Sequence, residues 1–174
     1  MMKRIALLLT LFFCGCEPYR QAGTVPLDWQ VYFSPNGGCT DAVVAALNRA
    51  TNSVLVQAYS FTSAPIAKAV VDAQRRHLQV AVILDKSQKT EKYSSADFLR
   101  NSGVATFIDS KHAIAHNKIM IIDGAAVLTG SFNFTKAAEE NNAENLLVIH
   151  DPALAAKYKA NWQAHLAHSV QYSD

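Results

Sequence analysis

Cysteine is scarce in this sequence, and its distribution limits the covalent chemistry open to the fold. The 174 residues contain three cysteines, and Cys14 and Cys16 lie close to the amino terminus, which leaves Cys39 alone well inside the chain. A disulfide needs two partners, so a bridge within the domain is not expected. Cys39 follows two glycines, which predicts a small packing residue in a loop rather than a nucleophile.

A general excess of positive charge is also missing. The formal net charge is +2, and without residues 1–15, which hold Lys3 and Arg4 but no acidic residue, 14 basic residues face 14 acidic ones. The broad basic surface of many nucleic-acid-binding proteins is therefore not expected. A local excess occurs in residues 86–118, where a solvated polar face is the commoner explanation. Its basic members are Lys86, Lys89, Lys92, Arg100, Lys111 and Lys118.

The apolar run near the amino terminus is too short to cross a bilayer. Lys3 and Arg4 precede the apolar residues 5–13, whereas a transmembrane helix needs about 20 residues. A positive start, a short apolar core and small residues after it predict an export signal. A buried first helix is disfavoured because the segment has no polar face.

Two modes of cleavage fit this signal. Residues 13–16, Phe-Cys-Gly-Cys, loosely resemble a bacterial lipobox, which would make Cys16 the lipidated first residue of the mature protein. Plain cleavage somewhere before Thr24 fits equally well. In both cases we expect residues 1–23 to be signal and linker, and residues 24–174 to form one exported domain. That domain would be periplasmic, tethered to the outer membrane through lipid on Cys16, or secreted.

Strand and helix patterns alternate through this domain and indicate its fold class. Strands are expected at 29–35, 53–61, 80–84 and 105–108, with helices between them at 41–49, 65–76 and 95–102. A hairpin and a strand at 144–150 follow, and Asp151 and Pro152 start a last helix with a core stripe of Leu154, Tyr158, Trp162 and Leu166. Thr40 is the expected cap of the first helix. The order predicts an α/β domain with a mixed β-sheet flanked by helices on both faces.

The hairpin lies within residues 112–134, which read HAIAHNKIMIIDGAAVLTGSFNF. Asp123 and Gly124 separate two apolar runs, and this dipeptide favours a two-residue type I′ turn, which needs positive φ. Such a turn sets Ile122 opposite Ala125.

This register brings polar side chains together at the open end of the hairpin. Counting back from the turn places His116 opposite Ser131 and Lys118 opposite Thr129, and alternate residues of a strand share a face. The expected cluster consists of His116, Lys118, Ser131 and Asn133. Asp123 has the opposite parity and is expected to stay outside it.

An imidazole, an ammonium, a hydroxyl and a carboxamide in one cluster suit phosphoryl transfer. Lys118 and Asn133 can donate hydrogen bonds to phosphate oxygens, and His116 can attack phosphorus to give a phosphohistidine that water then resolves. The second imidazole nitrogen needs an acceptor, for which Glu144 is the best candidate by position. The acidic residues 139–140 are expected to be exposed.

The spacing His116-x-Lys118, Asp123, Gly130-Ser131-x-Asn133 resembles the HKD motif of the phospholipase D superfamily. The upstream stretches FSPNGG, AYSFTSAPIAKAVVDAQRR and VAVILDKSQ resemble the small bacterial endonucleases of that superfamily, which carry one motif. The likeness runs from about Val31 to His150 and so covers nearly the whole domain.

The resemblance implies a phospholipase D/nuclease-like fold with one HKD motif per chain and assigns roles to its residues. It makes His116 the nucleophile and Glu144 the residue that orients it. Lys118, Ser131 and Asn133 would contact the phosphoryl group. Asp123, with Gly124 and Gly130, would be structural, and neither a cofactor nor a metal ion would be required.

One motif leaves the departing alkoxide without a proton donor, because His116 cannot supply a proton while it is bonded to phosphorus. Small members of the family solve this by forming a two-fold homodimer in which the two motifs meet. The resemblance therefore implies a homodimer, an isologous assembly in which His116 of the second copy protonates the leaving oxygen.

A metal centre is a weaker reading of the same stretch. His112 and His116 are four residues apart with Asp109 nearby, but this segment reads as loop into strand, and a zinc motif such as His-Glu-x-x-His is absent. His112 is expected to be a substrate-side or surface residue. No role is expected for the histidines that lie outside any motif, His77, His150, His165 and His168.

Three functions are compatible with the motif. A nonspecific nuclease acting on DNA, and also RNA, is favoured by the single motif and the small size. A lipid phosphodiesterase of the phospholipase D type would use the same chemistry and would suit a lipid-tethered protein, but no membrane-inserting amphipathic segment follows the signal. A catalytically idle binding protein is disfavoured by the intact motif.

Overall fold

The computed structural model describes residues 28–173, so the predicted export signal and Cys16 lie outside the described residues. Eight strands form one sheet in the order β1-β7-β6-β5-β2-β3-β4-β8. β2, β3 and β4 run parallel, and the other neighbours are antiparallel. The strands are β1 (Asp28–Ser34), β2 (Ser53–Ala58), β3 (Gln79–Asp85), β4 (Ala105–Asp109), β5 (Lys118–Ile122), β6 (Ala126–Gly130), β7 (Glu144–His150) and β8 (Val170–Gln171).

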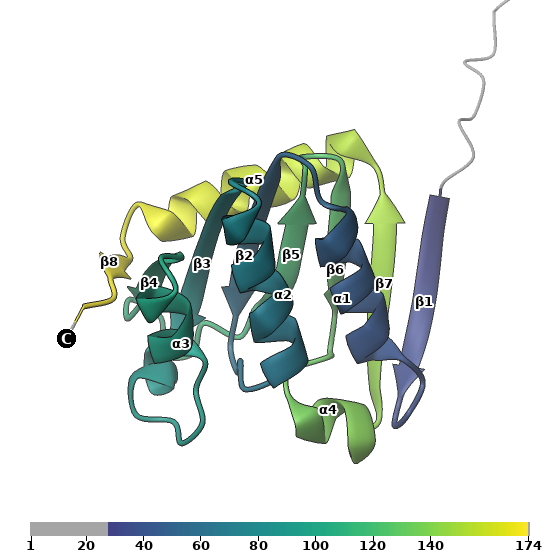
Figure 1. Cartoon of the computed structure of the whole chain (residues 1–174), viewed down its shortest axis with the longest axis horizontal. Coiled ribbons are helices and arrows are strands. Elements are labelled where there is room, and N and C mark those ends of the chain that lie inside the picture. The colour runs from purple at the N-terminus through teal and green to yellow at the C-terminus, as the bar shows by residue number, and fades with distance from the viewer. Residues whose placement is uncertain (1–27, 174) are drawn as a thin grey trace, which may run out of the picture.

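Helices cover both faces of this sheet, which confirms the predicted fold class (Figure 1). The helices are α1 (Cys39–Arg49), α2 (Ala64–Arg75), α3 (Ala96–Asn101), α4 (Lys136–Glu140) and α5 (Pro152–Leu166), with a 3-10 turn η1 (Lys86–Lys89). The larger core cluster packs α1, α2 and α3 on one face, through residues such as Val43, Ile66 and Leu99. The smaller cluster packs Trp162 of α5 on the other face against Ile83 and Ile121. Among the described residues, none of the helices is both long and apolar enough to pass through a bilayer.

The antiparallel pairings gather several strand ends at one edge of the sheet. β1, β2 and β6 end there and β5 and β7 begin there, beside α4 at the bottom of Figure 1. We call this the carboxyl edge; its terminal strand residues are Ser34, Ala58, Lys118, Gly130 and Glu144. A site built at this edge draws side chains from segments far apart in the sequence.

The two predicted helix caps have different outcomes. Asp151 accepts hydrogen bonds from the N–H groups of Ala153 (2.8 Å) and Leu154 (3.1 Å), which confirms it as the N-cap of α5. The prediction that Thr40 caps α1 is wrong. The helix begins at Cys39, and the carboxylate of Glu139 accepts from the N–H groups of Gly38 (3.0 Å) and Thr40 (2.7 Å). Glu139 is therefore half-buried rather than exposed. Its carboxylate pairs with backbone N–H groups at the start of α1, which have no partner within the helix.

The predicted hairpin register is wrong by one residue. Asp123 (φ 55°) and Gly124 (φ 64°) have the expected positive φ, and Ala125 donates to the carbonyl of Ile122 at 2.9 Å. Pairing nevertheless resumes with Ile122 opposite Ala126, so Ala125 is an extra residue in the loop. Ile119 rather than Lys118 therefore lies opposite Thr129.

Candidate active site

Lys118 is a buried lysine at the carboxyl edge. It begins β5, pairs with Ala58 of β2 and is 7% exposed. Its Nζ donates to the carbonyl oxygen of His116 at 3.0 Å. Burial lowers the pKa of Lys118, and the negative charge of Glu144 opposes that shift. An ammonium so placed is fixed in position and shielded from bulk water, which strengthens its action on a nearby phosphate.

His116 is exposed, and its ring packs at a tilt of 55° against an aromatic ring that the sequence did not reveal. Its imidazole lies 4.6 Å from the ring of Tyr59, between centroids, and the Nζ of Lys118 lies 5.3 Å from the same ring. Tyr59 follows β2 directly, and its N–H donates to the carbonyl of Asn117 at 2.8 Å. A position just past the carboxyl end of a strand is a common place for functional residues in α/β sheets, and this rule could have identified Tyr59.

Glu144 lies on the same face of the sheet as Lys118. It begins β7 and has the parity of Leu146 and Val148, just as Lys118 has the parity of Met120. Its carboxylate accepts from Asn142 Nδ2 at 3.2 Å, and not from His116. That Glu144 orients the imidazole therefore stays a prediction, whereas its electrostatic interaction with Lys118 is part of the structure.

Ser131 lies directly after the end of β6, outside the hydrogen-bonded pairing of the strands. β6 ends at Gly130, whose φ of 149° and close approach to β7 exclude a side chain, because a Cβ there would lie 2.2 Å from the carbonyl oxygen of Asn145. The Ser131 hydroxyl then accepts from the backbone N–H of Asn145 at 3.0 Å. The parity that was expected to place Ser131 beside His116 does not apply beyond Gly130.

Asn133 borders a hollow beside Tyr59. The hollow has a volume of about 380 Å³, and Lys92 and Tyr93 also line it. The side-chain oxygen of Asn133 is buried and lacks a hydrogen-bond partner among residues 28–173. An unsatisfied buried amide is costly unless a ligand pairs with it, so this atom marks a place where a substrate group can bind.

The carboxyl edge therefore brings four of the five predicted catalytic side chains into one neighbourhood around Tyr59 and Lys118. His116 and Lys118 contact Tyr59, Asn133 lines the hollow with Tyr59, and Glu144 acts on Lys118. Ser131 lies at the same edge and is held by Asn145, the residue after Glu144. Direct hydrogen bonds do not join these five side chains to one another in the described part of the chain.

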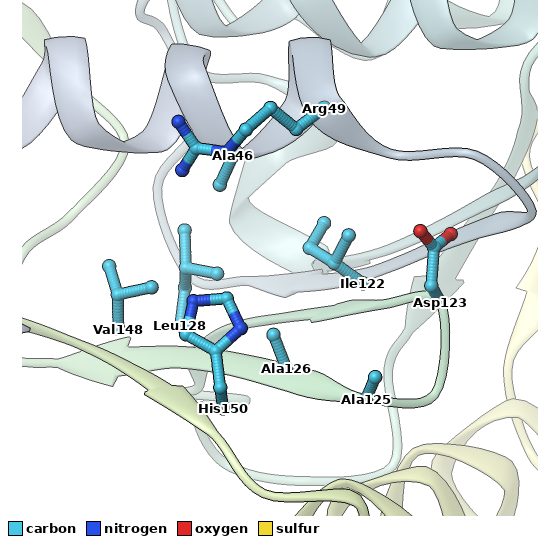
Figure 2. A pocket seen from close by; sticks show the side chains of 9 residues that line it. All are labelled: Ala46, Arg49, Ile122, Asp123, Ala125, Ala126, Leu128, Val148 and His150. Atoms are coloured by element: carbon cyan, nitrogen blue, oxygen red, sulfur yellow. The ribbon is translucent and has the colours of Figure 1, made fainter. Parts of the chain in front are cut away.

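Asp123 lies at the opposite edge of the sheet. Its carboxylate accepts from the N–H groups of residues 51–53 at 2.7–3.2 Å and from the Thr51 hydroxyl at 2.9 Å. Figure 2 shows it beside a hollow of about 130 Å³ beneath the end of α1, to which Arg49 and His150 also contribute. None of the predicted catalytic side chains lies at this end of the sheet. Asp123 therefore stays outside the catalytic cluster, as predicted.

Cys39 is not available for chemistry. Its side chain is fully buried at the start of α1. Burial, with the nearby charges of Glu139 and Glu144, raises the pKa of the thiol to about 11. It is a packing residue, as predicted, although it lies in a helix rather than in a loop.

Comparisons with known proteins agree with this fold and motif. The family model "Cardiolipin synthase, PLD-like domain" matches residues 43–166. A protein named Phospholipase D from Rickettsia felis is 42% identical over 130 residues, which cover 75% of this chain and 65% of the relative. Mitochondrial cardiolipin hydrolase from Xenopus laevis is 32% identical over 114 residues, 66% of this chain and 54% of that protein. The chain belongs to the phospholipase D-like family.

Two solved structures give the same result in three dimensions. Nuc from Salmonella typhimurium, a phospholipase D family member, has a TM-score of 0.81 and 38% sequence identity, and the match covers 85% of this chain and 99% of that one. NucT from Helicobacter pylori has a TM-score of 0.78 and 26% identity, over 84% and 99% of the two chains. The chain spans 65% of the length of the Rickettsia relative, but nearly all of these two structures.

Proposed function

We propose that this protein is an exported phosphodiesterase that hydrolyses nucleic acid, DNA above all and RNA as well, without a catalytic metal. The observation that carries the proposal is that the exposed imidazole of His116 and the buried ammonium of Lys118 lie against the same ring, that of Tyr59. A nucleophile that substrate can reach and a fixed cation next to it are the two components that attack on a phosphodiester needs.

The reaction proceeds in two balanced steps. A nitrogen of His116 bonds to phosphorus as the bond to the leaving oxygen breaks, and an acid gives that oxygen a proton. Water then attacks the phosphohistidine, the N–P bond breaks, and the conjugate base of the acid takes a proton from the water. Lys118 and Asn133 would bind the phosphoryl oxygens throughout, with Ser131 beside them.

The acid in this scheme is His116 of a second copy of the chain. One motif supplies one such imidazole, and His116 is exposed, so a partner subunit can reach the substrate. Co-expression of wild-type and His116→Ala chains tests this directly. Because both imidazoles are needed, activity should fall with the square of the wild-type fraction; a linear fall would show that one subunit is sufficient.

Two side chains that line the hollow beside Asn133 and Tyr59 favour nucleic acid over lipid as the substrate. Tyr93 is 77% exposed, and the Nζ of Lys92 lies 4.9 Å from its ring centre. An exposed aromatic ring with an adjacent cation suits a stacked base and its phosphate.

A lipid phosphodiesterase is the second candidate, and a specific feature favours it. A hollow of about 820 Å³ adjoins the first through Tyr93, and it is lined by the apolar side chains of Ala64, Ala67 and Phe98 with Lys68 and Arg75. An acyl chain would fit such a lining. The names of the relatives from Rickettsia and Xenopus refer to lipid substrates.

One set of assays separates these functions. The protein is incubated in EDTA with plasmid DNA, RNA and phosphatidylcholine vesicles, beside His116→Ala and, as a matched control, His150→Ala, since His150 is exposed at the opposite edge of the sheet. Nucleic acid should be cleaved by the wild type and His150→Ala alone. Tyr93→Ala should lower kcat/KM on DNA by about 5- to 150-fold, the equivalent of one stacked base. Cleavage of lipid but not DNA would reverse the ranking.

Export and lipid attachment are tested separately. Cys16→Ala should abolish labelling by a fatty acid if the lipobox is used, while Cys14→Ala should leave it intact. Plain cleavage would be indicated by two results together: no fatty-acid labelling of the wild type or of Cys14→Ala, and a mature chain whose first residue lies between the apolar run and Thr24.

A further inference from the structure

Three histidines converge on one buried carboxylate beyond the motif. Asp109 ends β4 and is fully buried. Its Oδ2 lies 2.8 Å from His165 Nδ1, 3.1 Å from His112 Nδ1 and 3.2 Å from His168 Nε2. The ring centroids of the three imidazoles are 4.9–5.3 Å apart. The cluster joins the end of β4 and the loop after it to the last turn of α5 and the segment that follows this helix.

Hydrogen bonds alone explain this arrangement poorly. A carboxylate oxygen has two lone pairs, yet three nitrogens approach the same one. His112 Nδ1 also lies 3.3 Å from Oδ1 and can be shared between the two oxygens, but three N–H groups would still point into one small space, where their partial positive charges repel. A cation in that space would instead use the nitrogen lone pairs and the carboxylate together.

We propose that Asp109, His112, His165 and His168 bind one divalent transition-metal ion, best matched by zinc. Their four candidate ligand atoms all lie within 4.8 Å of one another. In a tetrahedral zinc site with bonds near 2.0–2.1 Å, ligand atoms are about 3.3 Å apart. The oxygen–nitrogen separations of 2.8–3.2 Å are within a few tenths of an ångström of that value, and the nitrogen–nitrogen separations, which are all within 4.8 Å, would shorten as the imidazoles turn toward the ion.

The set of ligands indicates a structural role for the ion. Four protein ligands fill a tetrahedral shell, whereas catalytic zinc keeps one position open. The side chains of His112, His165 and His168 are 42%, 15% and 22% exposed, so an ion can enter from solvent. The other oxygen of Asp109, Oδ1, accepts a hydrogen bond from the N–H of Lys111 at 3.0 Å, and this bond orients the carboxylate.

The ion would fasten the loop that delivers His116. That loop runs between β4 and β5 and is already tied by the N–H of Ala115 to Asp85 (2.7 Å) and by Lys86 Nζ to the carbonyl of His112 (3.1 Å). His112 is four residues before His116, and metal binding at His112 would link this loop to the end of α5. The ion touches no substrate, so the metal-independent reaction proposed above and this site stand or fall separately.

Protein purified from expression of the full chain, stripped with EDTA and dialysed, provides the test. Titration with zinc chloride should give one ion per chain and raise Tm by several degrees, and cobalt(II) should give the intense visible absorption of a tetrahedral site. His165→Ala and His112→Ala should each weaken zinc binding by at least about 100-fold. His77→Ala is the matched control, because His77 lies outside the cluster.

His112→Ala is the decisive variant, because its side chain is the most exposed of the four and its loss is least able to unfold the chain. Zinc binding below one ion per chain, an unchanged Tm, an octahedral cobalt spectrum or equal losses in His77→Ala would each overturn the proposal. Activity in EDTA below the melting temperature is expected to persist; its loss would count against the proposed reaction, not against the ion.

Discussion

Asp123→Asn should destabilise the protein without slowing its chemistry. The carboxylate accepts from three consecutive backbone N–H groups, residues 51–53, and from the Thr51 hydroxyl. Asparagine has one acceptor oxygen and no charge, so part of this set is lost. Hydrogen bonds to charged groups are worth about 1.5–3 kcal/mol each. Since the site is partly exposed, we expect a net loss of one such bond, about 2 kcal/mol, or about 4–8 °C in Tm.

The pH dependence of this loss identifies its cause. Burial would raise the pKa of Asp123, but the hydrogen bonds from residues 51–53 outweigh it and hold the pKa below its ordinary value. The charged form is therefore favoured by folding, and its contribution is present above the unfolded pKa of about 3.9 and is lost as pH falls through the folded pKa. The Tm difference between wild type and variant should be full at pH 7 and shrink below about pH 4.

Calorimetry at several pH values and kcat measured well below Tm form the assay. Asp28→Asn, at an exposed residue of β1, is the control for a simple change of charge. An Asp123→Asn protein with unchanged Tm and reduced kcat would refute the reasoning, because Asp123 would then act in the reaction from the wrong edge of the sheet.

Three further predictions concern Gly130, Lys118 and Asp151. Gly130→Ala should cost about 1–3 kcal/mol of backbone strain and lower kcat, because the new Cβ would displace Asn145 and with it Ser131; denaturant titration and steady-state kinetics check this. The pKa of Lys118, followed by NMR, should lie below its ordinary value, and Glu144→Gln should lower it further by removing the charge that opposes burial; an upward shift would contradict the coupling. Asp151→Ala should cost about 1 kcal/mol through loss of the α5 cap, measured by thermal unfolding, with turnover unchanged.

The fold could be predicted from local patterns because each element carries its own signal. The apolar run at 80–84 is typical of a strand covered on both faces, and β3 is such a strand. The stripe from Leu154 to Leu166 identified the buried face of α5. Short elements without periodicity escaped prediction; β8 has two residues and α4 five, too few for a pattern to repeat.

The candidate site was harder to predict because its contacts cross the sequence. Motif spacing identified His116 and Lys118, but the register counted from the turn was wrong, since Ala125 adds a residue that an Asp-Gly signal does not reveal. Glu139 was expected on the surface, although it caps a helix about a hundred residues earlier in the chain. The histidines at 165 and 168 had no motif, and Asp109 gathers them only in the folded chain.

A near-neutral composition is compatible with a polyanionic substrate because the charge that matters is buried. Lys118 is 7% exposed, and only one hydrogen bond, to the His116 carbonyl, fixes its ammonium among the described residues. At equal distance a charge acts about four times more strongly in an environment of effective dielectric constant near 20 than in water. Burial lowers the pKa of this lysine, and the negative charge of Glu144 opposes that shift. One shielded cation can therefore stabilise a phosphoryl group in a chain whose formal net charge is only +2.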